Sequence, residues 1–363
     1  MDPYLYKPLF LAATTLIGYI TAARYLVASP SHKMRSGIII PLAISIFLVF
    51  WLGRRPINGG AFGDTANYAL EYLTMSASDR VVSMNWHSEW IWSLLMVTCK
   101  KMEISVEGFF TIVEAGYILS ALWAIKRFMP SNPMLGLLFI VTSLMFFTFG
   151  VNGLRNGLAC HIILLAMSFL FDDKYVVGGL LCLLALGMHR SVMLPIAAIM
   201  AGCFVIKDYK YAVMIWVGAI VLSLLEGEAI TNFFAWLDFD DRMTSYVALD
   251  DNGAFSSTGF RWDFLLYSSF PILMGWYVCE KKKIRDDWYK ALCIAYCLCN
   301  AFWVIVIRIA FSNRFAYLSW FMYPIVIAYP LINLPLWEDQ NKKTGMILAV
   351  YCSFTLFINT FLW

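Results

Sequence analysis

Charge is scarce in this sequence. Asp, Glu, Lys and Arg together make up 14% of its 363 residues, whereas an ordinary soluble domain carries about 25%. Hydrophobic residues make up 61%, and the mean hydropathy is +0.70. Most of the surface must therefore face surroundings that do not solvate charge. This composition argues against a soluble protein and for one embedded in a membrane.

Common catalytic and cofactor motifs are also missing. There is no Walker loop, GxGxxG motif or GxSxG motif, so a nucleotide-driven motor and an α/β-hydrolase are disfavoured. The nine cysteines lie almost wholly in apolar runs without zinc-like spacing, which favours packing roles. The aspartate pairs lack metal-ligand spacing with histidine. We expect no cofactor and no metal site, although the acid-rich residues 238–241 leave a divalent ion open.

Uncharged apolar runs recur along the whole chain. Because they are continuous and not alternating, they favour helices over a β-barrel. A spanning helix needs about 17–25 apolar residues, and the runs predict an all-α polytopic membrane protein with about 12–13 hydrophobic segments. The runs cover residues 37–53, 134–154, 175–188, 191–206, 211–225, 264–279, 291–307, 315–337 and 344–363, and residues 3–23 and 108–125 with one interruption each.

Nothing in the sequence divides these segments into separate domains. No internal repeat or low-complexity tract stands out, so we expect residues 1–363 to form a single transmembrane domain. No small-residue cleavage site closes the first apolar run, so we expect that segment to be a retained helix and not a signal peptide.

The polar connectors sort into two kinds. Residues 54–87 and 226–260 form two long connectors that are poor in lysine, and the second is rich in acid. Short connectors hold most of the lysine, which the positive-inside rule places in the cytoplasm. We expect the two long connectors to be outer, periplasmic loops. The parity of the spans requires one segment not to cross, and our first candidate is residues 89–99; the turn at 150–156 is the second.

The cations expected on the outer side are arginines. Four of them, at positions 155, 190, 308 and 314, sit against apolar runs, where a charge costs about 2.5–3.5 kcal/mol at mid-bilayer. Arginine suits a planar, bidentate partner such as a phosphate or diphosphate. The alternative is that each arginine reaches lipid headgroups or pairs with loop carboxylates. We prefer a shared anionic site, because the four arginines stand at helix ends from distant parts of the chain. The full set of arginines expected on the outer side is Arg54, Arg55, Arg80, Arg155, Arg190, Arg242, Arg261, Arg308 and Arg314.

Three local motifs add chemistry to this site. Asn152-Gly-Leu-Arg155 opens a helix after a glycine turn, so backbone amides and the guanidinium can face one anion. His189 stands between two apolar runs, where it can serve as a general base or can be satisfied by helix packing. Asp64 is either the N-cap of a surface helix or a catalytic carboxylate. Glu114, inside an apolar run, is a functional candidate that an interhelical hydrogen bond would explain equally well.

The order of the motifs resembles a known family. Gly63-Asp64-Thr65 with Tyr68 is followed by Glu89, Asn152-x-x-Arg155, His189-x-Ser191, Arg242-x-x-x-Tyr246 and Arg314-Phe-x-Tyr317. In this order they resemble the EpsG family, the Wzy-like polymerases of bacterial surface polysaccharides. The family often has glutamine after the middle arginine. Asn156 stands there in this chain, so the contact of that glutamine is not carried over.

The resemblance implies a multi-pass protein of the bacterial inner membrane with a glycosyltransferase family C-like helical bundle. It would join undecaprenyl-diphosphate-linked oligosaccharide repeat units at the outer face, with the lipid diphosphate as leaving group. Its partners would be these lipid-linked glycans, membrane lipids, and a flippase and chain-length regulator of the same pathway; no nucleic acid is expected. An O-antigen ligase, a membrane acyltransferase and a lipid-linked oligosaccharide transporter or flippase remain alternatives. Within these motifs we expect His189, Asp64 and Arg155 to be catalytic and Asn152, Tyr68, Glu89, Arg190, Arg242, Tyr246, Arg308, Arg314 and Tyr317 to bind substrate.

Overall fold

The computed structural model describes residues 2–29, 32–75, 89–236, 259–308 and 312–361. Every regular element among these residues is a helix, which confirms the expectation of an all-α polytopic membrane protein. Within these described ranges, five helices are long and apolar enough to cross a membrane: Pro3–Val27, Val106–Phe128, Asp287–Ile305, Asn313–Asn333 and Gln340–Phe361. Shorter apolar helices of 10–17 residues are Ile39–Gly53, Leu154–Leu170, Tyr175–Met188, Arg190–Val205 and Tyr209–Leu225.

Side-chain caps fix where several helices begin. The Ser105 hydroxyl accepts a hydrogen bond from the Gly108 amide, and the Asp286 carboxylate accepts one from the Tyr289 amide. Asn132 caps the helix Pro133–Val141 in the same way, because its side chain accepts a hydrogen bond from the Leu135 amide. The first residue of this helix is proline, whose missing N–H would have no partner within the helix at that position. The apolar runs thus become helices with polar residues at their starts.

The chain divides into two compact units. The expectation that residues 1–363 form a single transmembrane domain stays a prediction. Unit 1 comprises residues 1–189 and 328–363, and unit 2 comprises residues 190–327. Unit 1 contains α1 (Tyr6–Val27), α2 (Ile39–Gly53), α3 (Gly59–Phe62), α4 (Thr65–Thr74), α5 (Trp90–Lys101), α6 (Val106–Phe128), α7 (Pro133–Val141), α8 (Phe146–Val151), α9 (Leu154–Leu170), α10 (Tyr175–Met188) and α18 (Gln340–Phe361).

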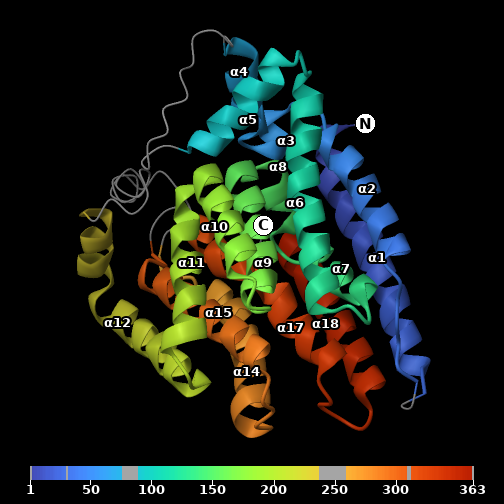
Figure 1. Cartoon of the computed structure of the whole chain (residues 1–363), viewed down its shortest axis with the longest axis vertical. Helices are drawn as coiled ribbons and strands as arrows, with labels where there is room; N and C mark the ends of the chain where they lie inside the picture. The colour runs from blue at the N-terminus through green and yellow to red at the C-terminus, as the bar shows by residue number, and fades with distance from the viewer. Residues whose placement is uncertain (1, 30–31, 76–88, 237–258, 309–311, 362–363) are drawn as a thin grey trace. The chain divides into compact units, whose positions relative to one another are not determined.

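Four helices of unit 1 form a row that carries the site. α2 packs on α6, α6 on α9, and α9 on α10 (Figure 1). Elsewhere in unit 1, α1 packs along α18, and glycines allow these two helices to approach each other closely. A Cβ on Gly18 would lie 2.6 Å from Cys352 Sγ, and one on Gly345 would lie 2.8 Å from the Ala22 carbonyl oxygen. Tyr19 and Ser353 share a hydroxyl–hydroxyl hydrogen bond of 2.7 Å across this contact.

The described part of the first predicted outer loop contains two helices. Within residues 54–87 the chain forms α3 and α4, and α4, α5 and one end of α6 lie together in Figure 1. Tyr72 of α4 stacks on Phe109 of α6 at 4.8 Å between ring centroids, and Trp92 of α5 contacts the same ring. α5 has 12 residues, about 18 Å of helix, against a hydrocarbon core of about 30 Å. This length agrees with our expectation that residues 89–99 do not span alone.

Two boundaries differ from the sequence analysis. The run at 134–154 is not one segment, because α7 ends at Val141 and α8 begins at Phe146. The Thr142 hydroxyl, at the break, donates to the Leu138 carbonyl at 2.6 Å, a local bond of the kind that competes with helix continuation. The predicted loop at 226–260 begins too early, because α12 continues to Trp236 through a stretch of helix-compatible residues.

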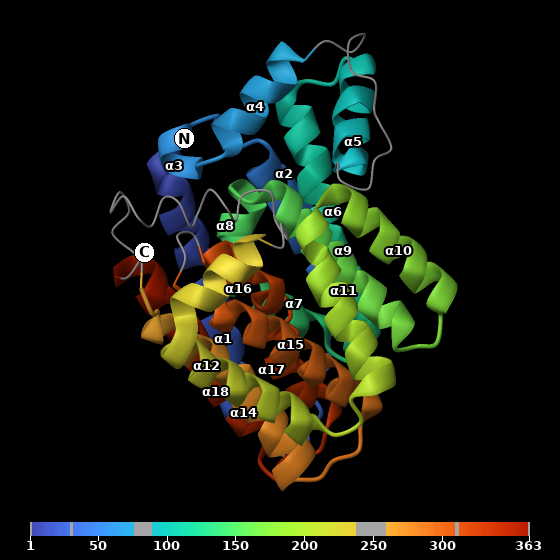
Figure 2. The same ribbon diagram turned by 90° about the vertical axis from the view of Figure 1, so that its left-hand side faces the viewer.

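Unit 2 is built around one buried helix, α15. This helix packs on α11, α12, α14 and α16 (Figure 2). Its Asn300 is fully buried, accepts a hydrogen bond from Trp216 Nε1 at 2.8 Å and donates one to Ser319 Oγ at 3.0 Å. The elements are η2 (Arg190–Val192), α11 (Met193–Met200), η3 (Ala201–Val205), α12 (Tyr209–Trp236), α14 (Trp262–Trp276), η4 (Tyr277–Lys281), α15 (Asp287–Ile305) and α16 (Asn313–Trp320); α17 (Tyr323–Asn333) runs across the boundary of the two units.

Candidate active site

The turn between α8 and α9 meets the start of α4. The Asp64 amide donates to Asn152 Oδ1 at 2.8 Å. Gly63, directly before, has a φ of +54°, and a Cβ at this position would lie 2.5 Å from the same oxygen. Only glycine therefore fits both the backbone conformation and the space. This contact brings two of the predicted motifs, 88 positions apart in the sequence, to one place.

Arg155, the second residue of α9, lies beside this turn. Its Nη1 forms an ion pair with Glu89 Oε2, and its Nε donates to the Tyr68 hydroxyl at 3.3 Å. The guanidinium carbon lies 5.5 Å from the centroid of the Tyr68 ring, within the range of a cation–π contact. The side chains of Arg155 and Glu89 are 22% and 17% exposed. The guanidinium is therefore held by a carboxylate and a phenol but is still reached by solvent.

Glu89 also contacts the predicted base. Its second oxygen, Oε1, contacts Nδ1 of His189, so one carboxylate bridges the arginine and the histidine. His189 follows the last residue of α10 in an extended conformation, and Glu89 directly precedes α5. The two helices approach closely here: a Cβ on Gly187 would lie 2.4 Å from Ile91 Cγ1. The glycine before His189 thus lets α10 come close enough for the contact.

The bridge fixes which nitrogen of His189 can act on a substrate. With Nδ1 directed at Glu89, the proton of a neutral imidazole is stabilised on Nδ1, which leaves the Nε2 lone pair available. A carboxylate in this position also stabilises the imidazolium that forms when Nε2 accepts a proton, as in the serine hydrolase triad. The arrangement can therefore perform general base chemistry beside a guanidinium.

Asp64 lies at the N-cap position of α4, but its side chain makes no capping hydrogen bond. The side chain instead accepts a hydrogen bond from Asn67 Nδ2 at 3.3 Å. Asp64 is therefore the N-cap residue by position, as one of the two interpretations expected, but its side chain does not cap the helix. Its catalytic role stays a prediction.

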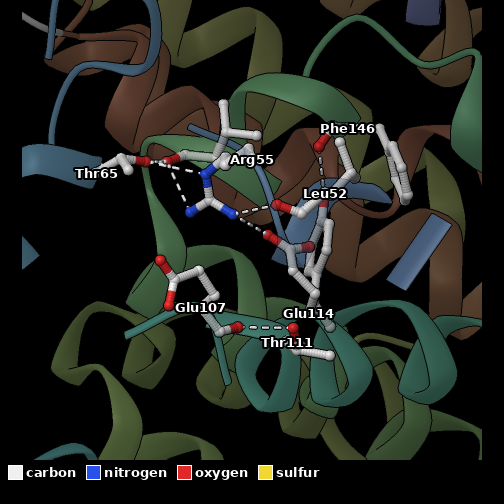
Figure 3. Close-up of polar contacts among 9 residues, drawn as sticks. Leu52, Arg55, Thr65, Glu107, Thr111, Glu114 and Phe146 are labelled. Atoms are coloured by element: carbon white, nitrogen blue, oxygen red, sulfur yellow. Dashed lines mark hydrogen bonds and ion pairs between the residues drawn. The ribbon is translucent and has the colours of Figure 1, made fainter. Parts of the chain in front are cut away.

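Arg55, one of the arginines expected on the outer side, is buried within the fold. The residue is 1% exposed and forms an ion pair with Glu114 of α6 at 3.1 Å (Figure 3). Arg55 is therefore closed to an external anion. One oxygen of Glu114, Oε1, is paired with this guanidinium, so a contact within the fold accounts for its charge.

The other residues predicted to bind substrate belong to unit 2 or lie outside the residues that the structure describes. Arg190 begins η2, and Arg308 lies with its guanidinium carbon 5.4 Å from the Phe260 ring centroid. Arg314 and Tyr317 are three positions apart on α16, and Tyr317 is buried. Arg242 and Tyr246 lie outside the described residues. The substrate-binding roles of all six stay predictions.

The bridging role of Glu89 was not predicted from the sequence, which indicated only a substrate-binding residue. The available signal was a single carboxylate directly before the apolar helix of residues 90–99, with no basic residue beside it in the sequence. Such a charge needs a partner from elsewhere in the fold. Among the described residues no three His, Cys, Asp or Glu side chains are grouped as metal ligands would be. The expectation of no cofactor stays a prediction.

A sequence model of the EpsG family matches residues 38–362, nearly the whole chain. The chain belongs to the EpsG family. No match was found among curated proteins or among solved structures. EpsG proteins are Wzy-like polysaccharide polymerases, which are glycosyltransferase-type membrane enzymes that act on lipid-linked glycans. The EpsG resemblance of the ordered motifs is thus confirmed, and the family match covers the bridged trio Glu89, Arg155 and His189.

Proposed function

We propose that this EpsG protein joins oligosaccharide repeat units carried on undecaprenyl diphosphate, at the outer face of the bacterial inner membrane. The observation that carries the proposal is the Glu89 carboxylate that contacts both Arg155 and His189. It puts an anion-binding group and a proton acceptor at one partly open place. Transfer from a lipid diphosphate to a sugar hydroxyl needs both groups.

The arginine serves the leaving group. When the bond between the donor sugar C1 and the diphosphate oxygen breaks, its electron pair goes to that oxygen, and negative charge grows there. A fixed guanidinium stabilises growing charge at small reorganisation cost. Arg155 is held in place by Glu89 and Tyr68 before substrate arrives, and its fork suits two phosphate oxygens.

The histidine serves the acceptor. Nε2 of His189 takes the proton of the acceptor hydroxyl while its oxygen forms the new bond to C1. Glu89 stabilises the imidazolium until the proton passes to water. Asp64 is the second candidate for this base, held near the site through the bond between its amide and Asn152.

Two other functions make different predictions. An O-antigen ligase would use the same donor and the same groups but a different acceptor, so it would transfer a glycan once and not lengthen it. A transporter would bind the diphosphate and break no bond. It would have no use for a histidine whose tautomer is set by a carboxylate.

The experiment is reconstitution of the purified protein in liposomes with lipid-linked glycans extracted from cells that lack this gene. Products are separated by chain length. Arg155→Ala should lower the rate of lengthening by about 10²–10³-fold, the usual cost of removing one donor to a developing oxyanion. His189→Ala should lower it by about 10²–10⁴-fold if His189 is the base.

The matched control is Arg127→Ala. Arg127 pairs with Asp172 at 2.9 Å, its side chain is 20% exposed, and the pair lies at the other end of α9 from Arg155. This variant should lengthen glycans at the wild-type rate. A wild-type protein that transfers once would favour the ligase, and one that moves the glycan without transfer would favour the transporter. Loss of lengthening in an Asp64→Asn variant with full activity in His189→Ala would exchange the roles of the two residues.

A further inference from the structure

A buried ion pair lies directly behind the proposed site. Arg55 Nη1 donates to Glu114 Oε1 at 3.1 Å, and both side chains are fully buried (Figure 3). The guanidinium carbon lies 4.7 Å from the centroid of the Phe110 ring. No substrate group reaches either charge. A buried pair of this kind adds little net stability by itself, so its place in the fold calls for another reason.

The guanidinium contacts four elements at once. Besides Glu114 of α6, it donates to the Leu52 carbonyl in the last turn of α2 at 2.7 Å. Its Nε donates to Thr65 Oγ1 at the start of α4 at 3.1 Å, and its Nη2 donates to the Val151 carbonyl at the end of α8 at 3.4 Å. One planar group therefore ties together the ends of helices whose loops carry the site.

Thr65 completes the connection. Its hydroxyl accepts from Arg55 and donates to the Val151 carbonyl, and the residue is fully buried. Directly beside it, the Asp64 amide donates to Asn152 Oδ1. Two adjacent residues of the Asp64 loop are thus bonded to two adjacent residues of the turn that leads to Arg155.

We propose that Arg55, Glu114 and Thr65 are positioning residues of the polymerase, which hold the loop of Asp64 in register with the turn of Asn152 and Arg155. The proposal rests on the function proposed above. The three side chains touch no substrate and act through the backbone of residues 64 and 151–152. Without them Arg155 keeps its charge and its contact with Glu89, but the loop facing it is no longer fixed.

The test uses a substitution that keeps shape and removes one hydroxyl, Thr65→Val, with Thr65→Ser as the rescue. The control is Thr14→Val, because Thr14 is also buried and also donates to a backbone carbonyl, that of Phe10 at 2.7 Å, but lies within α1. Two quantities are measured in the full-length protein. One is hydrogen–deuterium exchange of the segment 58–68, and the other is the dependence of lengthening rate on the concentration of extracted lipid-linked glycan.

Thr65→Val should speed exchange in residues 58–68 and lower the maximal rate by about 10–100-fold, the scale of a displacement of about 1 Å in a reacting geometry. The half-saturating concentration should stay close to that of the wild type. Thr65→Ser should restore both quantities, and Thr14→Val should change neither. A Thr65→Val protein with wild-type exchange and rate would overturn the proposal.

Two further arms keep the outcome clear. If Thr65→Val does not fold in detergent, Arg55→Lys takes its place, since lysine keeps the charge but has no planar fork to reach four acceptors. An Arg55→Lys protein with full rate would then contradict the proposal. The exchange measurement needs no substrate, so wild-type protein that forms no polymer would refute the proposed function while residues 58–68 still report on the positioning.

Discussion

Unit 1 contains two arginine–glutamate pairs that differ in their access to water. Arg55 and Glu114 are fully buried, whereas Arg155 and Glu89 are about one-fifth exposed. The guanidinium of Arg55 donates hydrogen bonds to two backbone carbonyls, one hydroxyl and one carboxylate of the protein. Arg155 is held by one carboxylate and one phenol and stands at a helix start.

The comparison shows that residue type alone does not assign a role to an arginine in a membrane protein. A guanidinium whose donors are used within the fold connects helix ends, and a partly exposed one can still meet an anion. The Glu89 pair also contacts His189, whose side chain is 15% exposed. On the functions proposed above, the open pair takes part in the reaction and the closed pair positions the loop beside it.

The largest effect is expected at the buried pair. Arg55→Ala leaves the Glu114 carboxylate without a counter-charge, and its Oε2 already has no hydrogen-bond partner among the described residues. Removal of one member of a buried pair typically costs about 3–5 kcal/mol of folding stability. The control is Arg54→Ala at the neighbouring exposed position, which should cost less than about 0.5 kcal/mol. Denaturant titration in detergent gives both values, and equal stability of the two variants would contradict the comparison.

A substitution in the partly exposed pair of Arg155 and Glu89 should lower the rate of glycan lengthening and leave the folding stability nearly unchanged. Glu89→Gln keeps the size of the side chain and a hydrogen-bond acceptor for Arg155. The amide cannot hold both partners as a carboxylate does, and it does not stabilise the imidazolium of His189. We expect lengthening to slow by about 10²-fold, at the lower end of general-base effects, with thermal unfolding nearly unchanged. Glu107→Gln, on the exposed face of α6, is the control, and a Glu89→Gln protein of full activity would rule out the bridging role.

The smallest effect is expected at the exposed ion pairs of Asp172. Hydrogen bonds from Lys174 and Arg127 lower the pKa of Asp172 below its ordinary value. Because the pKa is lower in the folded state, the stabilisation is present above the unfolded value of about 3.9 and is lost as the pH falls through the folded pKa. Asp172→Asn should therefore lower the melting temperature slightly at pH 7, and the difference from wild type should vanish in strong acid. A difference that persists below this pKa would show that packing, and not charge, is responsible.

The helical membrane fold could be predicted from the sequence because its signal is local. Continuous apolar runs with polar residues at their starts fix helix type, and Asn152-Gly153 marks a real break. The break near Thr142 and the extension of α12 to Trp236 could not be read in this way. Both fall inside stretches where the residues on either side are equally compatible with a helix.

The site could be predicted only in part. The order of the motifs predicted which residues belong to the site. The contacts of Glu89 with Arg155 and His189 could not be predicted from the local sequence, because they depend on how α5, α9 and α10 pack. Arg54 and Arg55 show the same limit. They are neighbours of one type directly after α2, yet one is exposed and the other is fully buried. The direction of each side chain is set by helices made later in the chain.

The contact of α1 with α18 has a consequence for biosynthesis. Tyr19 and its partner Ser353 are separated by 334 positions, and the glycines that let the two helices approach lie on both of them. A ribosome that has released α1 into the bilayer must make most of the chain before the surface of that helix meets its partner. Until then the face of α1 that carries Gly18 lacks the helix that it packs against. Closure of unit 1 is therefore a late event, and a chain shortened before α18 would leave its first helix without this neighbour.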